Sequence, residues 1–228
     1  MGSSRGGFGY APHKKVEDSG IIGINRDWYL PPNGEQRFQP LAGGIYGYTF
    51  LHEICHALGL KHPHEKVNGF PTFPGIKKGG YIGSHKGDFE QNAPPYTQMT
   101  YVTDVGGEEY ENAPRKREYG YLENPGALDI ATLQWLYGAN TEHESKDNIY
   151  VLPVKTKRGT GWSTIWDTGG IDSIEGRNAK SSVTIDLRNA NLGNNGRAGG
   201  SISSINGVMG GFTIAHDWDG KTVQQKPG

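Results

Sequence analysis

The chain has 228 residues, a formal net charge of −1 and a hydrophobic fraction of 34%. Charges of both signs are interspersed, which excludes the basic surface expected of a nucleic-acid-binding protein. No apolar run is long enough to cross a bilayer, and the single cysteine excludes a disulfide within the chain. The 36 glycines are about twice the usual share and favour turns and short strands. Met1–Ser4 is interpreted as an expression-vector leader, and no signal peptide is recognisable.

Two short segments near the start are predicted to be β-strands. Gly6–Ala11 precedes a proline and has the pattern of an edge strand, and Ile21–Asn25 follows as the next strand. A helix is then predicted around His52–His62 from the apolar residues Ile45, Phe50, Leu51, Ile54, Leu58 and Leu60. They are numerous enough for the helix to be buried on most of its sides.

The segment His52–His62 reads HEICHALGLKH and predicts a catalytic zinc site. His52 and His56 lie one helical turn apart, so both imidazoles can reach one metal ion. Gly59 can take the left-handed conformation that ends a helix, and the turn brings back His62 as the third ligand. Three protein ligands leave one tetrahedral position open, which is typical of a catalytic zinc site. Glu53 is the candidate general base because it lies beside the ligands without being one.

Cys55 and His64 lie within or beside this motif and also carry groups that can bind a metal ion. Cys55 is interpreted as a small core residue, with zinc ligation as the alternative. His64 is expected on the surface, since Pro63 makes its competition with His62 for a metal ion geometrically awkward.

The extended motif, with Pro63 after the third histidine, resembles the metzincin zinc endopeptidases of the serralysin-like branch. Gln98–Tyr101 is similar to the methionine turn of that family, Pro125–Asn140 to its closing helix and, more weakly, Ile165–Asp172 to a later segment. The resemblance implies an α+β fold with a mixed sheet, a zinc helix and a closing helix, shortened at the N-terminus. It also implies a catalytic domain over residues 1–140 and a β-rich segment over residues 141–228 that precedes the position of a β-roll.

The resemblance implies roles for two residues of the methionine turn. Tyr101 would bind zinc in the resting enzyme and swing out to hydrogen-bond the oxyanion, the alternative being a core tyrosine. Met99 would pack beneath the histidines without touching the metal.

The C-terminal part is predicted to consist of short strands separated by Asn, Asp and Gly turns. The predicted strands are Ile149–Leu152, Trp162–Trp166, Ser182–Leu187 and Gly211–Ala215. The calcium-binding nonapeptide repeats of serralysins are not found in this sequence. The resemblance nevertheless implies one candidate calcium site, an oxygen-only set of ligands comprising Glu144, Lys146, Asn148, Asp167, Gly169 and Asp172. The alternative is that Asp167 and Asp172 stabilise a Gly-Gly turn.

The predicted function is that of a secreted zinc-dependent endopeptidase acting on proteins or peptides. A proteinaceous protease inhibitor is a candidate partner, and neither nucleic acid nor a membrane span is expected. The alternative is a non-catalytic, zinc-containing, β-rich binding or adhesion module in which the zinc is structural.

Overall fold

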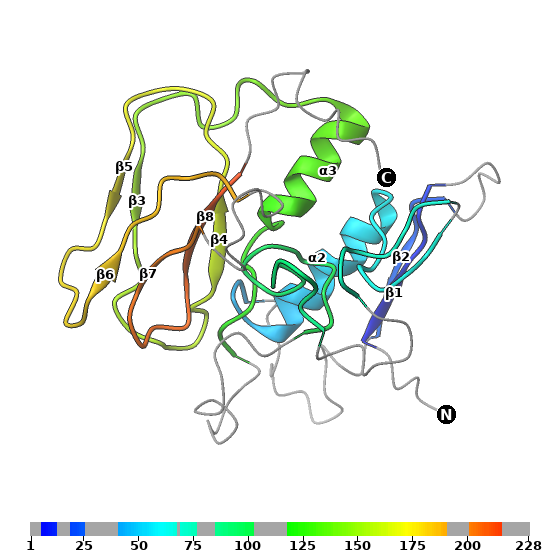
Figure 1. The fold of residues 1–228 in the computed structure, drawn as a ribbon, viewed down its shortest axis with the longest axis horizontal. Helices are drawn as coiled ribbons and strands as arrows, with labels where there is room; N and C mark the ends of the chain where they lie inside the picture. The colour runs from blue at the N-terminus through cyan, green and yellow to red at the C-terminus, as the bar shows by residue number, and fades with distance from the viewer. Residues whose placement is uncertain are drawn as a thin grey trace.

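A computed structural model describes residues 6–12, 19–25, 41–67, 69–76, 85–102, 118–190 and 201–215. Figure 1 shows helices α2 and α3 near the centre, with strands β1 and β2 on one side and strands β3 to β8 on the other. Within these ranges no helix is both long and apolar enough to pass through a membrane.

Helix α2 spans Ile45–Ala57 and confirms the helix predicted around the zinc motif. Its end follows from Gly59, which has φ of 100°, and the N–H of Leu60 then donates to the Cys55 carbonyl at 3.0 Å. The helix is less buried than predicted, because Phe50 and Leu58 remain 37% and 38% exposed.

Helix α3 spans Ala127–Tyr137 and corresponds to the predicted closing helix. Its first turn is held by Asp129, whose carboxylate accepts from the N–H of Gly126 at 2.8 Å. It ends at Gly138, which has φ of 86° and caps the helix through its N–H.

The first two predicted strands are confirmed, although both are short. β1 (Gly7–Gly9) pairs antiparallel with β2 (Ile22–Ile24), with Gly7 opposite Ile24. The pair packs on α2, and a Cβ atom at Gly9 would lie 2.4 Å from the Glu53 carbonyl oxygen. Glycine at this position therefore lets the strand lie directly against the helix that carries Glu53.

The C-terminal half forms two small sheets, one with two strands and one with four. The larger sheet has the order β4-β8-β7-β6, in which β4 and β8 are parallel and the other pairs antiparallel. The strands are β3 (Ile149–Val151), β4 (Trp162–Ile165), β5 (Ser173–Glu175), β6 (Val183–Thr184), β7 (Ser203–Ile205) and β8 (Gly211–Ile214). Two helices with this mixed sheet confirm the predicted α+β class. β5 and β7 were not predicted.

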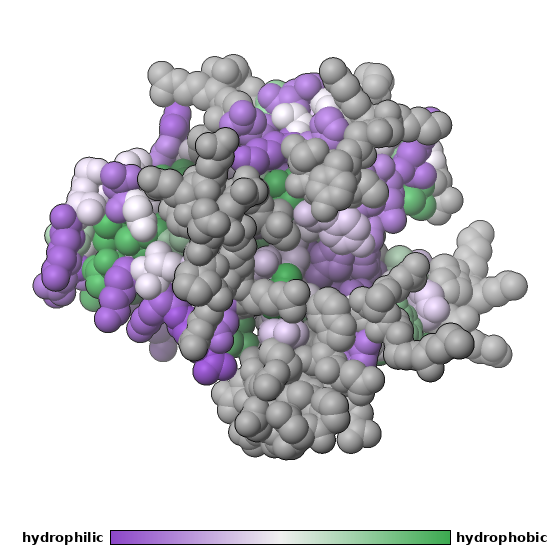
Figure 2. Space-filling model, turned by 90° about the horizontal axis from the view of Figure 1, so that it is seen from below, coloured by the Kyte–Doolittle hydropathy of each residue, from purple (hydrophilic) through white to green (hydrophobic). Residues whose placement is uncertain are grey.

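A core cluster joins helix α2 to the C-terminal sheet. Tyr48 of α2 packs with Tyr121, Leu122 and Trp162, all of which are buried. Figure 2 shows apolar surface left open among hydrophilic residues at the end formed by the C-terminal strands. In that part of the chain Ile149 is 63% exposed and Ile171 is 85% exposed.

Candidate metal centre

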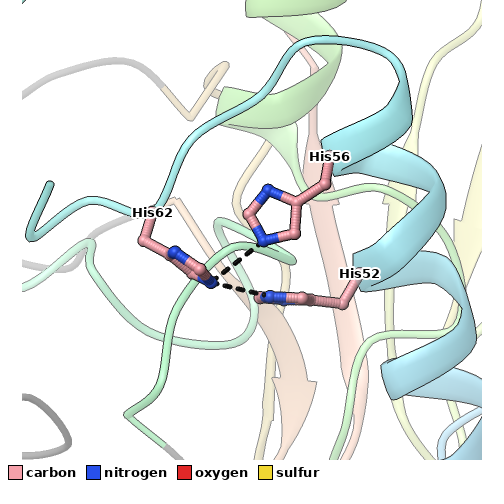
Figure 3. A group of neighbouring side chains, drawn as sticks. All are labelled: His52, His56 and His62. Atoms are coloured by element: carbon pink, nitrogen blue, oxygen red, sulfur yellow. Dashed lines mark hydrogen bonds between the residues drawn. The ribbon is translucent and has the colours of Figure 1, made fainter. Parts of the chain in front are cut away.

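Three histidines converge where helix α2 meets the chain that follows it. Nε2 of His62 lies 3.0 Å from Nε2 of His52 and 3.0 Å from Nε2 of His56 (Figure 3). His52 and His62 are buried and His56 is half-buried. The predicted spacing therefore brings the three imidazoles together around one point.

Each of the three rings has an oxygen atom close to its other nitrogen, and in two of them that oxygen accepts a hydrogen bond. Nδ1 of His52 donates to the Gln98 carbonyl at 2.7 Å, and Nδ1 of His56 donates to the Leu60 carbonyl at 2.8 Å. A carbonyl cannot donate, so both rings carry their proton on Nδ1.

The third ring has a carboxylate in the same position. Nδ1 of His62 lies 2.9 Å from Oε1 of Glu65, although the angle is not that of a hydrogen bond. The short distance to a negative oxygen still favours a proton on Nδ1, because the attraction does not depend on ideal alignment.

The short contacts between the Nε2 atoms depend on which ring nitrogens carry a proton. Burial lowers the pKa of His52 to about 3 and that of His62 to about 4, so both rings are neutral at neutral pH. With their protons on Nδ1, His52 and His56 both point an Nε2 lone pair at Nε2 of His62, which can donate a hydrogen bond to at most one of them at 3.0 Å. A cation between the three Nε2 atoms would accept a lone pair from each of them, and three imidazole nitrogens with one open position suit zinc.

Glu53 lies on α2 next to His52 and is buried. A Cβ atom placed on Gly7 would lie 3.2 Å from Oε1 of Glu53, so strand β1 runs across the carboxylate. Burial raises the pKa of Glu53 to about 7. A carboxylate with a pKa near neutrality can both accept and release a proton.

Tyr101 and Met99 both lie near the histidines. The ring of Tyr101 has its centroid 4.5 Å from that of His62 and 5.7 Å from that of His52, and its side chain is 46% exposed. Tyr101 is therefore not a core tyrosine. Met99 is buried with Cys55 and Leu60, which agrees with the interpretation of Cys55 as a core residue.

Similar proteins place this centre in a family. The chain is 31% identical over 186 residues to a serralysin of Proteus mirabilis, a match covering 74% of the chain and 34% of that protein. It is 30% identical over 192 residues to serralysin C of Dickeya chrysanthemi, covering 79% of the chain and 34% of that protein. The chain is a serralysin-like metzincin. Metallopeptidase AprA of Pseudomonas marginalis is 27% identical over 217 residues, covering 90% of the chain and 43% of that protein.

No family model matches the sequence. The serralysin-like chain spans about a third of the length of the first two relatives, as the 34% coverage of each shows. Zinc is the cofactor that these relatives and the three imidazole nitrogens together indicate.

Asp129 has a position in this centre that the sequence analysis missed. Its carboxylate accepts from the hydroxyl of Thr97 at 2.6 Å and from the N–H of Gln98 at 2.5 Å, besides the N–H of Gly126. Burial raises the pKa of Asp129 to about 6, against the effect of these three donors, so the group is ionised at neutral pH. Because the Gln98 carbonyl accepts from His52, Asp129 connects helix α3 to the first histidine.

His64 is half-buried, so the expectation of a surface residue is met only in part. Its ring stacks on that of His62 with centroids 4.9 Å apart and lies 5.2 Å from that of Tyr101. Glu65, which was given no role from the sequence, accepts from the N–H of His62 at 3.1 Å. Residues 62–65 form a turn in which the N–H of Glu65 donates to the His62 carbonyl at 3.0 Å, and the turn keeps His64 and Glu65 close to the His62 ring.

The residues of the candidate calcium site lie close together in the C-terminal part. Asn148 donates through its backbone N–H to Asp172 at 2.9 Å and through its side chain to Glu144 at 3.1 Å and Asp167 at 3.3 Å. The N–H of Gly169 donates to Asp167 at 3.0 Å.

The sixth residue, Lys146, lies with its carbonyl 2.5 Å from where a Cβ atom on Gly170 would stand. In the described ranges, however, these carboxylates are not among the groups of three whose ligand atoms lie within 4.8 Å of one another. Calcium binding here therefore stays a prediction.

Proposed function

We propose that this serralysin-like chain is the zinc-binding part of an endopeptidase that hydrolyses peptide bonds of protein substrates. The observation that carries the proposal is the convergence of Nε2 of His52 and Nε2 of His56 on Nε2 of His62, each at 3.0 Å, beside a buried carboxylate. The similarity to serralysins supports the same reaction. These relatives do not favour the alternative of a non-catalytic zinc module.

His52, His56 and His62 would hold zinc through Nε2. When bound, zinc supplies a Lewis acid that lowers the pKa of a coordinated water to about 7 and polarises the substrate carbonyl. Glu53 would take the proton of the attacking water and deliver it to the leaving amine. Its pKa of about 7 suits both halves of that transfer.

Tyr101 would act as the switch, with its hydroxyl donating to the oxyanion in the transition state. Its exposure of 46% and its ring contacts with His52 and His62 support this role, because a side chain so placed can turn without disturbing the core.

The domain organisation is proposed as a catalytic part over residues 1–140 and a β-rich part over residues 141–228. Within the described residues, helices α2 and α3 and the β1-β2 pair lie before residue 141 and strands β3 to β8 lie after it, which supports the division. Leu122 bridges to Trp162, and Asn124 bonds the backbone of Thr164, so the two parts are joined by direct contacts.

Calcium is proposed as a second ion, held by oxygen atoms of Glu144, Asp167 and Asp172 with the carbonyls of Lys146 and Gly169. Asn148, which bonds to three of these residues, would give way or turn its amide oxygen inward. A rise in the midpoint of thermal unfolding on adding calcium, lost in Asp172→Asn, would support the site. An equal rise in the variant would rule it out.

Secretion, and inhibition by a proteinaceous inhibitor, are proposed from the similarity to serralysins. The test of the whole proposal is casein cleavage by the zinc-loaded protein with and without a chelator. Cleavage that stops with the chelator and returns with zinc supports an endopeptidase. A protein that binds zinc but does not cleave casein would support the alternative, in which the zinc is structural.

A further inference from the structure

His64 and Glu65 form a second group of ligand residues together with His62. The ligand atoms of the three side chains lie within 4.8 Å of one another, and the described residues contain one other such group, that of the three histidines. His62 is buried, whereas His64 and Glu65 are half-buried, so the group is open to solvent on one side.

The two groups share His62 through its two ring nitrogens. Nε2 points to His52 and His56, whereas Nδ1 lies 2.9 Å from Oε1 of Glu65. The ring of His64 is stacked on that of His62 at an interplanar angle of 19°, and one of its nitrogens lies within 4.8 Å of the ligand atoms of His62 and Glu65. The second group therefore adjoins the other ring nitrogen of His62, next to the first group and not within it.

We propose that Nδ1 of His62, the imidazole of His64 and the carboxylate of Glu65 form a second, weaker site for zinc. Two imidazoles and one carboxylate are a ligand set that zinc accepts. Zinc holds its ligand atoms about 3.4 Å apart, whereas those of this group lie within 4.8 Å of one another. The side chains of His64 and Glu65 must therefore rotate toward the ion, and the cost of this movement weakens binding. With both ions bound, His62 would be a bridging imidazolate, because the second ion takes the place of the Nδ1 proton, which is released to solvent.

Sharing one imidazole makes the two sites depend on each other. Two cations on one ring repel, so each ion should weaken binding of the other by the same factor. The proposal goes beyond the proposed function because it requires no hydrolysis and would hold for an inactive protein.

The test is zinc titration of the chelator-stripped full chain against a chromophoric competitor, with bound metal counted by mass spectrometry. Wild type should bind two equivalents, the second more weakly. His64→Gln should bind one, at the tighter affinity, because the first group is intact. His56→Ala should also bind one, because it keeps all three residues of the second group. That ion should bind about 5-fold to 150-fold more tightly than the second equivalent of wild type, since the competing ion is absent.

A matched control separates this site from adventitious binding by exposed imidazoles. His143 lies in the exposed 141–147 stretch and bonds through its backbone to Thr168, so His143→Gln should keep both equivalents. Glu65→Gln should lose the second, and provides an independent variant should His64→Gln fail to fold by circular dichroism.

The titrations distinguish failure of the second zinc site from failure of the three-histidine centre. A single equivalent in wild type, a second equivalent that survives in both His64→Gln and Glu65→Gln, or no binding by His56→Ala would overturn the second site. No binding by His64→Gln with one ion bound by His56→Ala would keep the second site and reject the three-histidine centre of the proposed function.

Discussion

Replacing Asp129 with alanine should both destabilise the fold and weaken zinc binding. The substitution removes the acceptor of two buried backbone N–H groups, those of Gln98 and Gly126. Each unpaired buried donor costs about 1–3 kcal/mol, so the loss should be roughly 2–6 kcal/mol. The buried hydroxyl of Thr97 loses the same acceptor, which adds to this loss. Asp129→Asn keeps one oxygen for both N–H groups and should cost only about 1–2 kcal/mol, the difference between charged and neutral hydrogen bonds.

The effect on zinc follows from the link between Asp129, the Gln98 backbone and Nδ1 of His52. Loss of a partner that orients a metal-binding histidine typically costs 10-fold to 100-fold in affinity. Asp129→Ala should cost about 10-fold, because Asp129 contacts the Gln98 backbone and does not contact His52 itself. Urea unfolding of the metal-free protein at pH 7.5 and competitive zinc titration measure the two effects. Exposed Glu142, changed to alanine, is the matched control. A destabilisation below 1 kcal/mol would refute the hydrogen-bond reasoning, and lower stability with unchanged zinc affinity would refute the link to His52.

Three further substitutions test the proposed chemistry. Glu53→Gln should keep one zinc ion in the three-histidine centre and lower turnover by about 100-fold to 10,000-fold, and near-normal casein hydrolysis would exclude Glu53 as the base. His52→Ala should lose that ion and lower the midpoint of thermal unfolding, since metal binding is coupled to folding; full zinc content by metal analysis would contradict the ligand set. Tyr101→Phe should lower kcat by about 100-fold or more with little change in KM, zinc content or thermal stability, and an unchanged kcat would reject the switch.

The parts of the centre that depend on local spacing could be predicted from the sequence. One helical turn separates His52 from His56, and the conformation of Gly59 returns His62, so the convergence follows from eleven residues with little help from the rest of the fold. Helix α2 and the first strand pair were predicted from local patterns of this kind, whereas helix α3 was predicted from the resemblance of residues 125–140 to the closing helix of metzincins.

The parts that depend on distant contacts could not be predicted. Asp129 reaches Gln98 across 31 positions, and nothing in the local pattern around α3 indicates that partner. Strands β5 and β7 contain Ser173, Ser203 and Ser204 and become strands through pairing with β3 and β8. The exposure of Phe50 likewise depends on which surfaces the neighbouring segments cover.

Zinc bound by His62 together with His52 and His56 would link the chain after Gly59 to helix α2. A metal ion on the three Nε2 atoms acts as a crosslink that holds the stretch after Gly59 against the helix, and Lys61 extends the tie by donating to the carbonyls of Glu65 and Pro71. Removing the ion would remove this crosslink and return the closure entropy of the loop, roughly 2 kcal/mol for ten residues. The segment from Leu58 to Ile76 should then be the first to open to hydrogen exchange and to a protease, while the core around Trp162 stays closed.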